Sequence, residues 1–336
     1  MSVHDGGLSG NVGRASLPIV SIIIAAYNAA PFIDRALASA RDQTLKDIEV
    51  IIIDDGSTDD TAEVAEKYSV DDLRFRVIRL CANSGVSFAR NVGLDSATGQ
   101  WVAILDADDS LLLDRLERLV IMAEKHECDL IVDNLTLVFP LENKSHLAFA
   151  DSRMSNPDSI SVDLFVDCDR PRLGLNAAGF SKPLIRRAFI ERNKLRYRVE
   201  ISIGEDFHFY VQALLRGADM RFTQYSGYIY NVTSGSLSRL DLRKVRHAIS
   251  QSSEMLINES EKVGNFTAVK ALRRREADIN AANDLTDILQ RWRRRELIGA
   301  SLIFMRSRVK AGVLYRLAAK VRYDLLVKVG VKFSVK

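Results

Sequence analysis

Three aspartates lie within the four residues Asp106-Ala107-Asp108-Asp109, directly after an apolar segment. Carboxylates crowded at the end of a buried strand repel one another unless a cation lies among them. Hard divalent ions such as Mg²⁺ or Mn²⁺ take oxygen ligands, often one or two carboxylates together with phosphate oxygens. Such an ion can link a protein to a diphosphate and stabilise charge on a leaving phosphate. The alternative is that Asp108 or Asp109 caps a helix that begins near Leu111.

The sequence lacks both common glycine-rich phosphate-binding motifs. No G-x-x-x-x-G-K-[ST] is present, which excludes a P-loop. No G-x-G-x-x-G follows the first apolar strand, so a dinucleotide-binding Rossmann site has no phosphate turn. A diphosphate bound to this chain therefore needs another source of positive charge, and a divalent cation on the aspartates would provide one.

Alternating strands and helices are expected to position these aspartates. Continuous apolar runs predict buried strands at residues 19–24, 48–53, 77–80 and 101–105, with helices at 32–43, 60–68 and 87–97. This order is typical of an open α/β sheet, in which ligands bind beyond the carboxyl ends of the strands. Polar residues follow three of the strands, and we expect them to line one crevice: Tyr27-Asn28, Asp54-Asp55 and Asp106, Asp108 and Asp109.

The pattern is weaker after about residue 135. Helices are expected near residues 183–195 and 207–216, and from residue 241 onward the chain is predicted to be almost continuously helical.

Four segments, in this order, resemble glycosyltransferase family 2: Ser21–Asn28, Ile51–Asp59, Gly85–Leu94 and Ala97–Asp109. Shorter matches follow at residues 182–187 and 203–206. The resemblance implies an inverting, nucleotide-sugar-dependent enzyme of the GT-A fold, of the type that assembles bacterial exopolysaccharide, capsule or O-antigen repeat units. It predicts an α/β fold with an open, mostly parallel sheet flanked by helices. One departure is Ala25, where many relatives have proline.

The resemblance also assigns the nucleotide site. The backbone at Ala25 and the ring of Tyr27 are expected to pack on the base, and Asp55 to accept the uracil N3–H, which favours UDP over GDP or CDP. The alternative for Asp55 is a cap on the following helix. Arg90 matches an arginine that contacts the base or the phosphates. The planar, permanently charged guanidinium of arginine suits a diphosphate. The alternative for Arg90 is a surface arginine on a helix.

The same resemblance divides the carboxylates between donor and acceptor. Asp106 is expected to meet the ribose and Asp108 the metal, Mn²⁺ or Mg²⁺, with Asp109 as a third carboxylate nearby. Inversion is a single in-line displacement, so a carboxylate must deprotonate the acceptor hydroxyl on the face opposite UDP. Asp206 matches this catalytic base, and Glu205 is expected to orient its neighbours or the acceptor. The alternative for Asp206 is simple capping of the next helix.

Charge is distributed unevenly along the chain of 336 residues, whose net charge is +3. Residues 239–336 contain 22 Lys and Arg against 10 Asp and Glu, so a mildly acidic body carries a strongly basic C-terminal region. From Arg291 onward, apolar residues at helical spacing are flanked by basic ones, which suits an interfacial helix on anionic lipid. The alternative is a basic helical subdomain that packs on the catalytic domain. Nucleic acid is not expected as a partner, since no nucleic-acid-binding module is recognisable.

These observations predict a disordered segment at residues 1–17, a GT-A domain at 18–238 and a basic helical region at 239–336. The expected reaction is metal-dependent transfer of a hexose, with glucose favoured, from a UDP-sugar to a glycan acceptor linked to polyprenyl diphosphate. No signal peptide or membrane-spanning segment is visible, so the expected location is the cytoplasm, on the inner face of the plasma membrane. The alternative function is a membrane-bound, catalytically inactive protein that binds sugar nucleotides.

Overall fold

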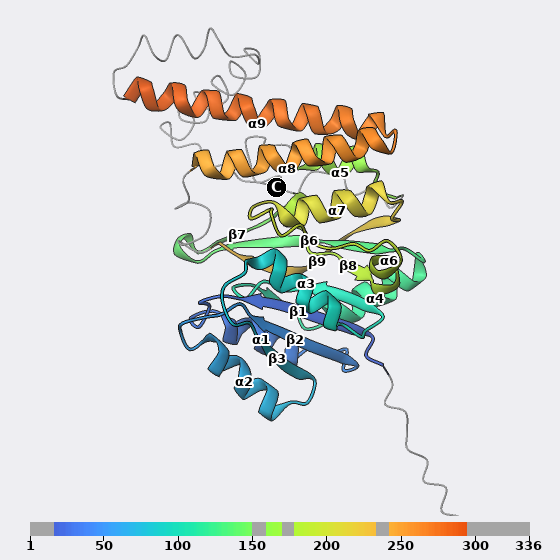
Figure 1. Ribbon diagram of the computed structural model, residues 1–336. Helices are drawn as coiled ribbons and strands as arrows, with labels where there is room; N and C mark the ends of the chain where they lie inside the picture. Colours follow the sequence, from blue (N-terminus) through green and yellow to red (C-terminus); the bar gives the residue numbers. More distant parts are fainter. Residues whose placement is uncertain (1–16, 150–158, 170–177, 233–241, 294–336) are drawn as a thin grey trace, which may run out of the picture.

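The computed structural model describes residues 17–149, 159–169, 178–232 and 242–293. Its centre is a nine-stranded sheet in the order β3-β2-β1-β4-β8-β6-β9-β5, with β7 paired to β6. Helices cover both faces of the sheet (Figure 1). The fold is a mixed α/β arrangement in which helices flank the sheet, as predicted.

The N-terminal part of the sheet is parallel and follows the predicted pattern. It contains β1 (Val20–Ala26), β2 (Ile48–Asp54), β3 (Phe75–Arg79) and β4 (Trp101–Ile104). Strands β1, β2 and β4 are almost wholly buried, as expected for apolar strands covered on both faces. The connecting helices are α1 (Ile33–Arg41), α2 (Thr61–Asp71) and α3 (Val86–Ser96). Gly93 lets α3 approach β1 and β2, because a Cβ atom there would collide with Ile23.

The second part of the sheet is mixed, which the sequence pattern did not predict. Strand β8 (Leu184–Arg186) is antiparallel to both β4 and β6 (Leu130–Phe139), whereas β9 (Met220–Asn231) is parallel to β6. Strand β5 (Ser110–Leu111) is antiparallel to β9, and β7 (Lys144–Leu147) is antiparallel to β6. Strands as short as β5 and β8 carry too few residues to show a period.

Helices in this part are α4 (Arg115–Lys125), α5 (Val162–Cys168), α6 (Arg187–Arg192) and α7 (Glu205–Leu215). The helix predicted near residues 183–195 is only partly present, because residues 184–186 pair with the sheet and α6 begins after them. The helix predicted near residues 207–216 is α7, which begins two residues earlier.

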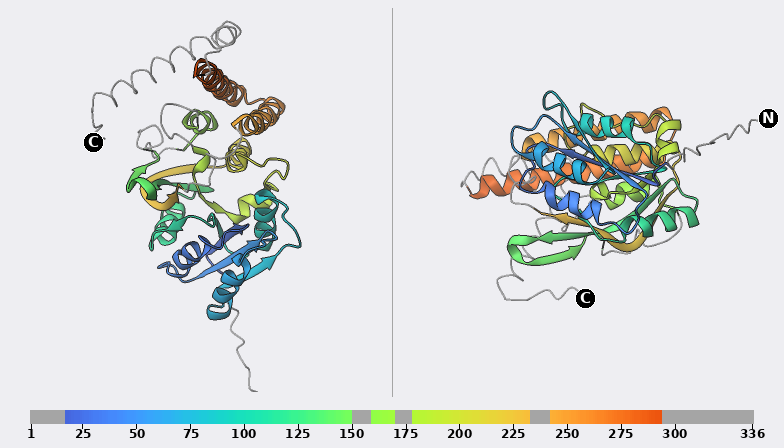
Figure 2. Two further views of the ribbon diagram at one scale, coloured as in Figure 1. Left: turned by 90° about the vertical axis from the view of Figure 1, so that its left-hand side faces the viewer. Right: turned by 90° about the horizontal axis from the view of Figure 1, so that it is seen from below.

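The described C-terminal residues form two long antiparallel helices, α8 (Leu242–Lys262) and α9 (Phe266–Arg293). They lie on α5 and α7, over the second part of the sheet (Figures 1 and 2). Apolar residues of both helices join the core that surrounds the sheet: Leu256, Ile257, Ala268, Ala271 and Leu272. Among the described helices, none is both long and apolar enough to cross a membrane. The expected disordered segment, apart from Leu17, and most of the basic amphipathic stretch lie outside the described residues.

Candidate active site

The loops that follow β1 and β2 lie side by side at the carboxyl edge of the sheet. Asn28, with a φ of 48°, donates its backbone N–H to Ser57 Oγ at 3.0 Å, and its side-chain oxygen accepts the Thr58 N–H at 2.9 Å. These bonds join the two loops predicted to bind the nucleotide. The ring of Tyr27 is 48% exposed and Ala25 is half-buried, so an apolar surface is available to a base at this edge.

Asp55 is buried and does not cap the following helix. Its two carboxylate oxygens accept the backbone N–H groups of Ser84 and Gly85, each at 2.8 Å, which fixes the turn before α3. The N-terminal turn of α2 is satisfied instead by Asp59, whose carboxylate accepts the Thr61 N–H at 3.1 Å. The capping alternative for Asp55 is therefore wrong. Each of its oxygens keeps a second lone pair that could accept a base N–H.

The loop after β4 gives its three aspartates different environments. Asp106 has two cationic partners: Arg90 Nη2 lies 2.7 Å from Oδ1 and Lys182 Nζ lies 2.8 Å from Oδ2. Burial disfavours its charge, but the charges of Lys182 and Arg90 outweigh burial and hold the pKa of Asp106 well below its usual range. Asp106 is therefore ionised at neutral pH.

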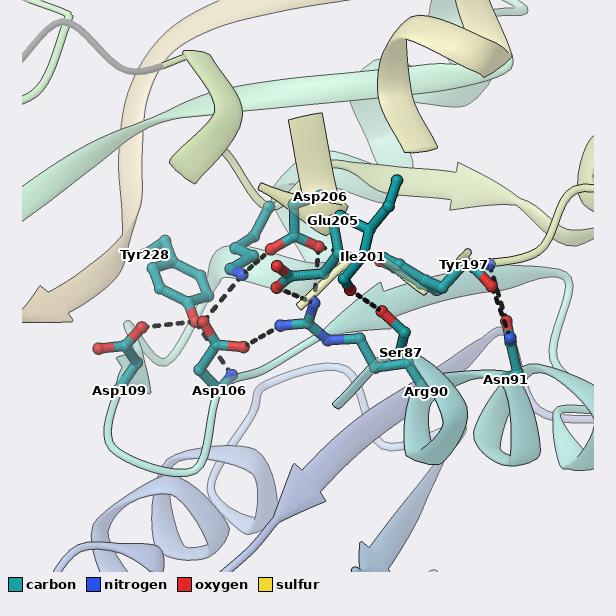
Figure 3. Close-up of polar contacts among 11 residues, drawn as sticks. Ser87, Arg90, Asn91, Asp106, Asp109, Tyr197, Ile201, Glu205, Asp206 and Tyr228 are labelled. Atoms are coloured by element: carbon teal, nitrogen blue, oxygen red, sulfur yellow. Dashed lines mark hydrogen bonds and ion pairs between the residues drawn. The ribbon is translucent and has the colours of Figure 1, made fainter. Parts of the chain in front are cut away.

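Asp109 is the most buried of the three. It accepts a hydrogen bond from Tyr228 Oη at 2.8 Å (Figure 3). It accepts a second from the Asn231 backbone N–H, also at 2.8 Å. Burial, together with the charges of Asp106 and Asp108, raises the pKa of Asp109 to about 8. The two hydrogen bonds of Asp109 anchor the loop to β9.

Asp108 is half-buried and, within the described part of the chain, forms no ion pair. Burial and the Asp106 charge raise its pKa. Its backbone carbonyl accepts from the Arg35 guanidinium, which holds the loop against α1. Residues 110–111 form β5, and the helix expected to begin near Leu111 is α4, which begins only at Arg115 with Asp114 at its N-cap position. Asp108 and Asp109 therefore do not cap it.

Glu205 and Asp206 open helix α7 opposite the aspartate loop. Gly204, with a φ of 78°, occupies the N-cap position, and neither carboxylate makes a side-chain capping bond there. Asp206 instead accepts from Lys182 Nζ at 2.5 Å, from Arg90 Nη1 at 2.9 Å and from Tyr197 Oη at 3.1 Å. The capping alternative for Asp206 is therefore wrong.

Arg90 is only 3% exposed, which excludes the alternative of a surface arginine. It links Asp106 to Asp206 and also donates to Glu205 Oε1 at 2.8 Å (Figure 3). Burial opposes its charge, but Asp206 and Asp106 raise the pKa of Arg90. Burial and the Asp206 charge also raise the pKa of Glu205, which lies at the edge of this network. The predicted Arg90, Asp106, Glu205 and Asp206 thus meet in one cluster.

The sequence pattern did not identify three residues of this cluster. Lys182 bridges Asp106 and Asp206, Tyr197 donates to Asp206, and Tyr228 links Asp109 to the backbone of Asp106. Lys182 was visible only as part of the family-like segment at 182–187. Tyr197 and Tyr228 reach the site through tertiary packing, and no local signal marks them.

Comparison with known proteins identifies the family of this chain. The family model described as Glycosyl transferase family 2 matches residues 21–173. The succinoglycan biosynthesis protein ExoO of Rhizobium meliloti is 31% identical over 284 residues, which cover 84% of this chain and 80% of ExoO. The succinoglycan biosynthesis protein ExoU of the same organism is 35% identical over 235 residues, 68% of each protein.

Two solved structures share the fold at lower identity. S. aureus TarS 1-349 in complex with UDP-GlcNAc aligns with a TM-score of 0.58 at 18% identity, covering 84% of this chain and 90% of TarS 1-349. The mannosyltransferase PcManGT from Pyrobaculum calidifontis, in complex with GDP-Man and Mn²⁺, aligns with a TM-score of 0.61 at 19% identity. The alignment covers 92% of this chain and 82% of PcManGT. These two structures support the GT-A fold. The similarity to ExoO, together with the family model, confirms the predicted resemblance: the chain is a glycosyltransferase and belongs to glycosyl transferase family 2.

Proposed function

We propose that this glycosyltransferase transfers a hexose, with glucose favoured, from a UDP-sugar to a hydroxyl of a glycan acceptor, with inversion and with a divalent cation. The observation that carries the proposal is that Asp106 and Asp206 share the same two cationic partners. These residues are a hundred positions apart, yet Arg90 and Lys182 each contact both of them. A donor-side carboxylate and a base therefore face one space, as an in-line displacement requires.

The nucleotide is assigned to the edge formed by β1, β2 and β4. Ala25 and Tyr27 pack on the base, Asp55 accepts its N–H, Asp106 meets the ribose, and Arg90 supports the phosphate side through Asp106. Asp55 is an acceptor and matches the uracil N3–H, whereas the corresponding nitrogen of cytosine is itself an acceptor, so UDP is preferred over CDP. The UDP-GlcNAc complex of TarS supports this choice, whereas PcManGT was solved with GDP-Man, so the fold alone is compatible with either base.

Asp108 is the residue proposed to hold Mn²⁺ or Mg²⁺. Within the described residues, no three or more His, Cys, Asp or Glu side chains are grouped so that they could hold a metal ion. Asp108 is nevertheless a half-buried carboxylate without an ion-pair partner there, next to Asp106 and Asp109. These residues fit a cation bound by one protein carboxylate, with the diphosphate oxygens as its other ligands. When bound, the cation would neutralise charge that develops on the leaving UDP.

Asp206 is proposed as the base. The acceptor hydroxyl oxygen attacks the anomeric carbon on the face opposite UDP, and the new C–O bond forms as the bond from that carbon to the phosphate oxygen breaks. The bonding electrons leave with UDP, and the hydroxyl proton passes to the Asp206 carboxylate. Glu205, which shares Arg90 with Asp206, orients the base or the acceptor.

The acceptor is proposed to be an oligosaccharide linked to polyprenyl diphosphate, in the assembly of a surface polysaccharide. Two of the relatives are named as succinoglycan biosynthesis proteins, which supports this class of product. The basic residues after Arg291 would place the enzyme against anionic lipid on the inner face of the plasma membrane. A sedimentation assay with phosphatidylglycerol vesicles tests this: binding that persists equally on neutral phosphatidylcholine vesicles would contradict it.

A binding and hydrolysis panel tests the donor site. UDP-, GDP- and CDP-sugars are each added with Mn²⁺ and with EDTA, and both thermal stabilisation and nucleotide release are recorded. We expect one UDP-sugar to stabilise the protein in a metal-dependent manner and to be hydrolysed slowly. Asp108→Ala should abolish both effects, while Asp95→Ala, which removes an exposed carboxylate paired with Arg196, should change neither. Stabilisation without any hydrolysis would favour the catalytically inactive binding protein instead.

A further inference from the structure

Lys182 is a buried cation with no assigned role, and it lies between the two halves of the active site. It is 3% exposed, and its ammonium nitrogen is 2.8 Å from Asp106 Oδ2 and 2.5 Å from Asp206 Oδ2. A fully buried ammonium ion is costly unless carboxylates compensate its charge. Two carboxylates from distant parts of the chain do so here, so Lys182 joins the donor side to the base.

The backbone around Lys182 is held rigidly. Lys182 lies two residues before Leu184, which pairs with Ala103 of β4, and Asp106 lies three residues beyond Ala103. The Lys182 carbonyl accepts from Arg115 Nη2 at 2.5 Å, and Arg115 forms a fully buried ion pair with Asp133 at 2.8 Å. The sheet and this ion pair therefore fix the backbone from which the Lys182 side chain reaches Asp106 and Asp206.

Charged groups of both signs surround Asp206. Two carboxylates, Glu205 and Asp106, share cationic partners with Asp206 and repel its charge. Two cations oppose them, and Lys182 makes the shorter contact of the two. The charged and titratable groups that face Asp206 come from α3, from the loop after β4, from the segments before β8 and α7, and from α7 itself: Arg90, Asp106, Lys182, Tyr197, Glu205 and Tyr210.

We propose that Lys182 is a positioning residue for the transfer step: its ammonium ion compensates the charge of Asp206 and holds that carboxylate at a fixed place relative to the donor-binding Asp106. This inference rests on the proposed function of Asp206 as the base. Lys182 itself does not touch the reacting atoms. It acts through Asp206, and loss of its charge should make that carboxylate harder to ionise.

The pH dependence of turnover tests the proposal in the full chain. Release of UDP from the UDP-sugar that the wild type hydrolyses fastest is measured between about pH 5 and pH 9 for the wild type, Lys182→Met and Lys182→Arg. In Lys182→Met the acid limb of the kcat/KM profile should move upward by about one to three pH units, because an opposite charge at contact distance is lost. Lys182→Arg retains the charge and should keep the acid limb within about half a unit of the wild type.

A matched variant separates this effect from general destabilisation. Arg275→Met removes another buried cation, paired with Asp169 at 2.6 Å, without touching Asp206. It should lower the melting temperature and leave the acid limb in place. An unchanged acid limb in Lys182→Met, or an equal shift in Arg275→Met, would overturn the proposal. If Lys182→Met does not fold, Lys182→Gln removes the charge and keeps a hydrogen-bond donor.

A titration that needs no donor distinguishes failure of this inference from failure of the proposed function. In protein labelled with ¹³C-carboxyl aspartate, the Asp206 resonance is the one that disappears in Asp206→Asn. Its midpoint should rise by about one to three pH units in Lys182→Met, and an unchanged midpoint would overturn the inference. Absence of UDP release from every UDP-sugar by the wild type would instead reject the proposed function, whatever the titration shows.

Discussion

The two parts of the sheet contribute to the active site in different ways. In the part formed by β1 to β4, strands and helices alternate, neighbouring strands are parallel, and the site residues follow directly on their strands. In the part formed by β5 to β9, the strands pair in both parallel and antiparallel directions. Side chains of this part reach the site from the segment before β8 (Lys182), from the start of α7 (Asp206) and from β9 (Tyr228). In the proposed function, the first part therefore carries the loops of the donor site, and the second supplies the proposed base, Asp206, and its surroundings.

This difference concerns how each residue is held. Donor-side residues depend on short loops that follow buried strands, so their positions depend on local geometry. Base-side residues depend on contacts between segments far apart in the chain, such as Arg90 with Glu205 or Arg115 with Lys182. We expect variants of the base side to disturb catalysis and stability together, and variants of the donor side to act mainly on nucleotide binding.

Removing the base should have the largest effect. Asp206→Asn keeps the size of the side chain but cannot accept a proton, so kcat should fall by about 10²- to 10⁴-fold. The affinity for UDP should stay within about threefold of the wild type, because Asp206 is on the acceptor side. Steady-state kinetics and calorimetric titration with UDP measure the two quantities. Loss of UDP binding in this variant would mean that the two parts are not functionally separate.

The buried pair beneath Lys182 should dominate the stability of the second part. Arg115→Met leaves the Asp133 carboxylate buried without its cation and should lower the free energy of unfolding by about 3–5 kcal/mol. The matched variant is Arg76→Met in the first part, where the pair with Glu49 is partly exposed and should contribute at most about 1 kcal/mol. Urea denaturation of both variants provides the comparison. Equal losses would contradict the difference between the two parts.

His208 should make the contact between α7 and α8 sensitive to acid. Its ring Nδ1 lies 3.1 Å from Ser252 Oγ on α8, and burial lowers the pKa of His208 to about 4. A histidine whose pKa is depressed on folding stabilises the fold above its unfolded pKa of about 6.5, and this contribution is lost as the pH falls toward 4.

His208→Gln removes this titration. Relative to the variant, the wild type should therefore lose on the order of 2 kcal/mol of stability between about pH 7 and pH 5. Urea denaturation at the two pH values measures the loss, and His126→Gln is the control, since His126 lies at the C-terminal end of α4. Parallel pH profiles for wild type and His208→Gln would contradict the prediction.

The smallest effect is expected for an exposed residue of the donor side. Tyr27→Ala removes a half-exposed ring, so the free energy of unfolding should change by less than about 0.5 kcal/mol. Loss of packing on the base should nevertheless weaken UDP binding by about tenfold, which corresponds to about 1.4 kcal/mol. Calorimetric titration with UDP, beside a melting curve, separates the two effects. Unchanged affinity for UDP would remove Tyr27 from the nucleotide site.

Sequence reasoning predicted the first part of the fold more completely than the second. The four parallel strands and their three helices lie within a few residues of their predicted positions, because each is a continuous apolar run or an amphipathic period. The short strands β5 and β8 were not predicted, since their conformation depends on pairing with β9, β4 and β6. The pattern also did not predict that residues 184–186, at the start of the helix expected near residues 183–195, would form a strand.

The types and the order of the site residues were determined by the sequence alone. The aspartates after β4, the Asp54-Asp55 pair and the Glu205-Asp206 pair occupy strand ends and helix starts, and local chain geometry is enough to bring such positions to the edge of a sheet. Only the tertiary structure decided their electrostatic environments. A pKa depends on burial and on charges within a few ångströms, and Arg90 and Lys182 reach Asp106 and Asp206 only when the chain is folded.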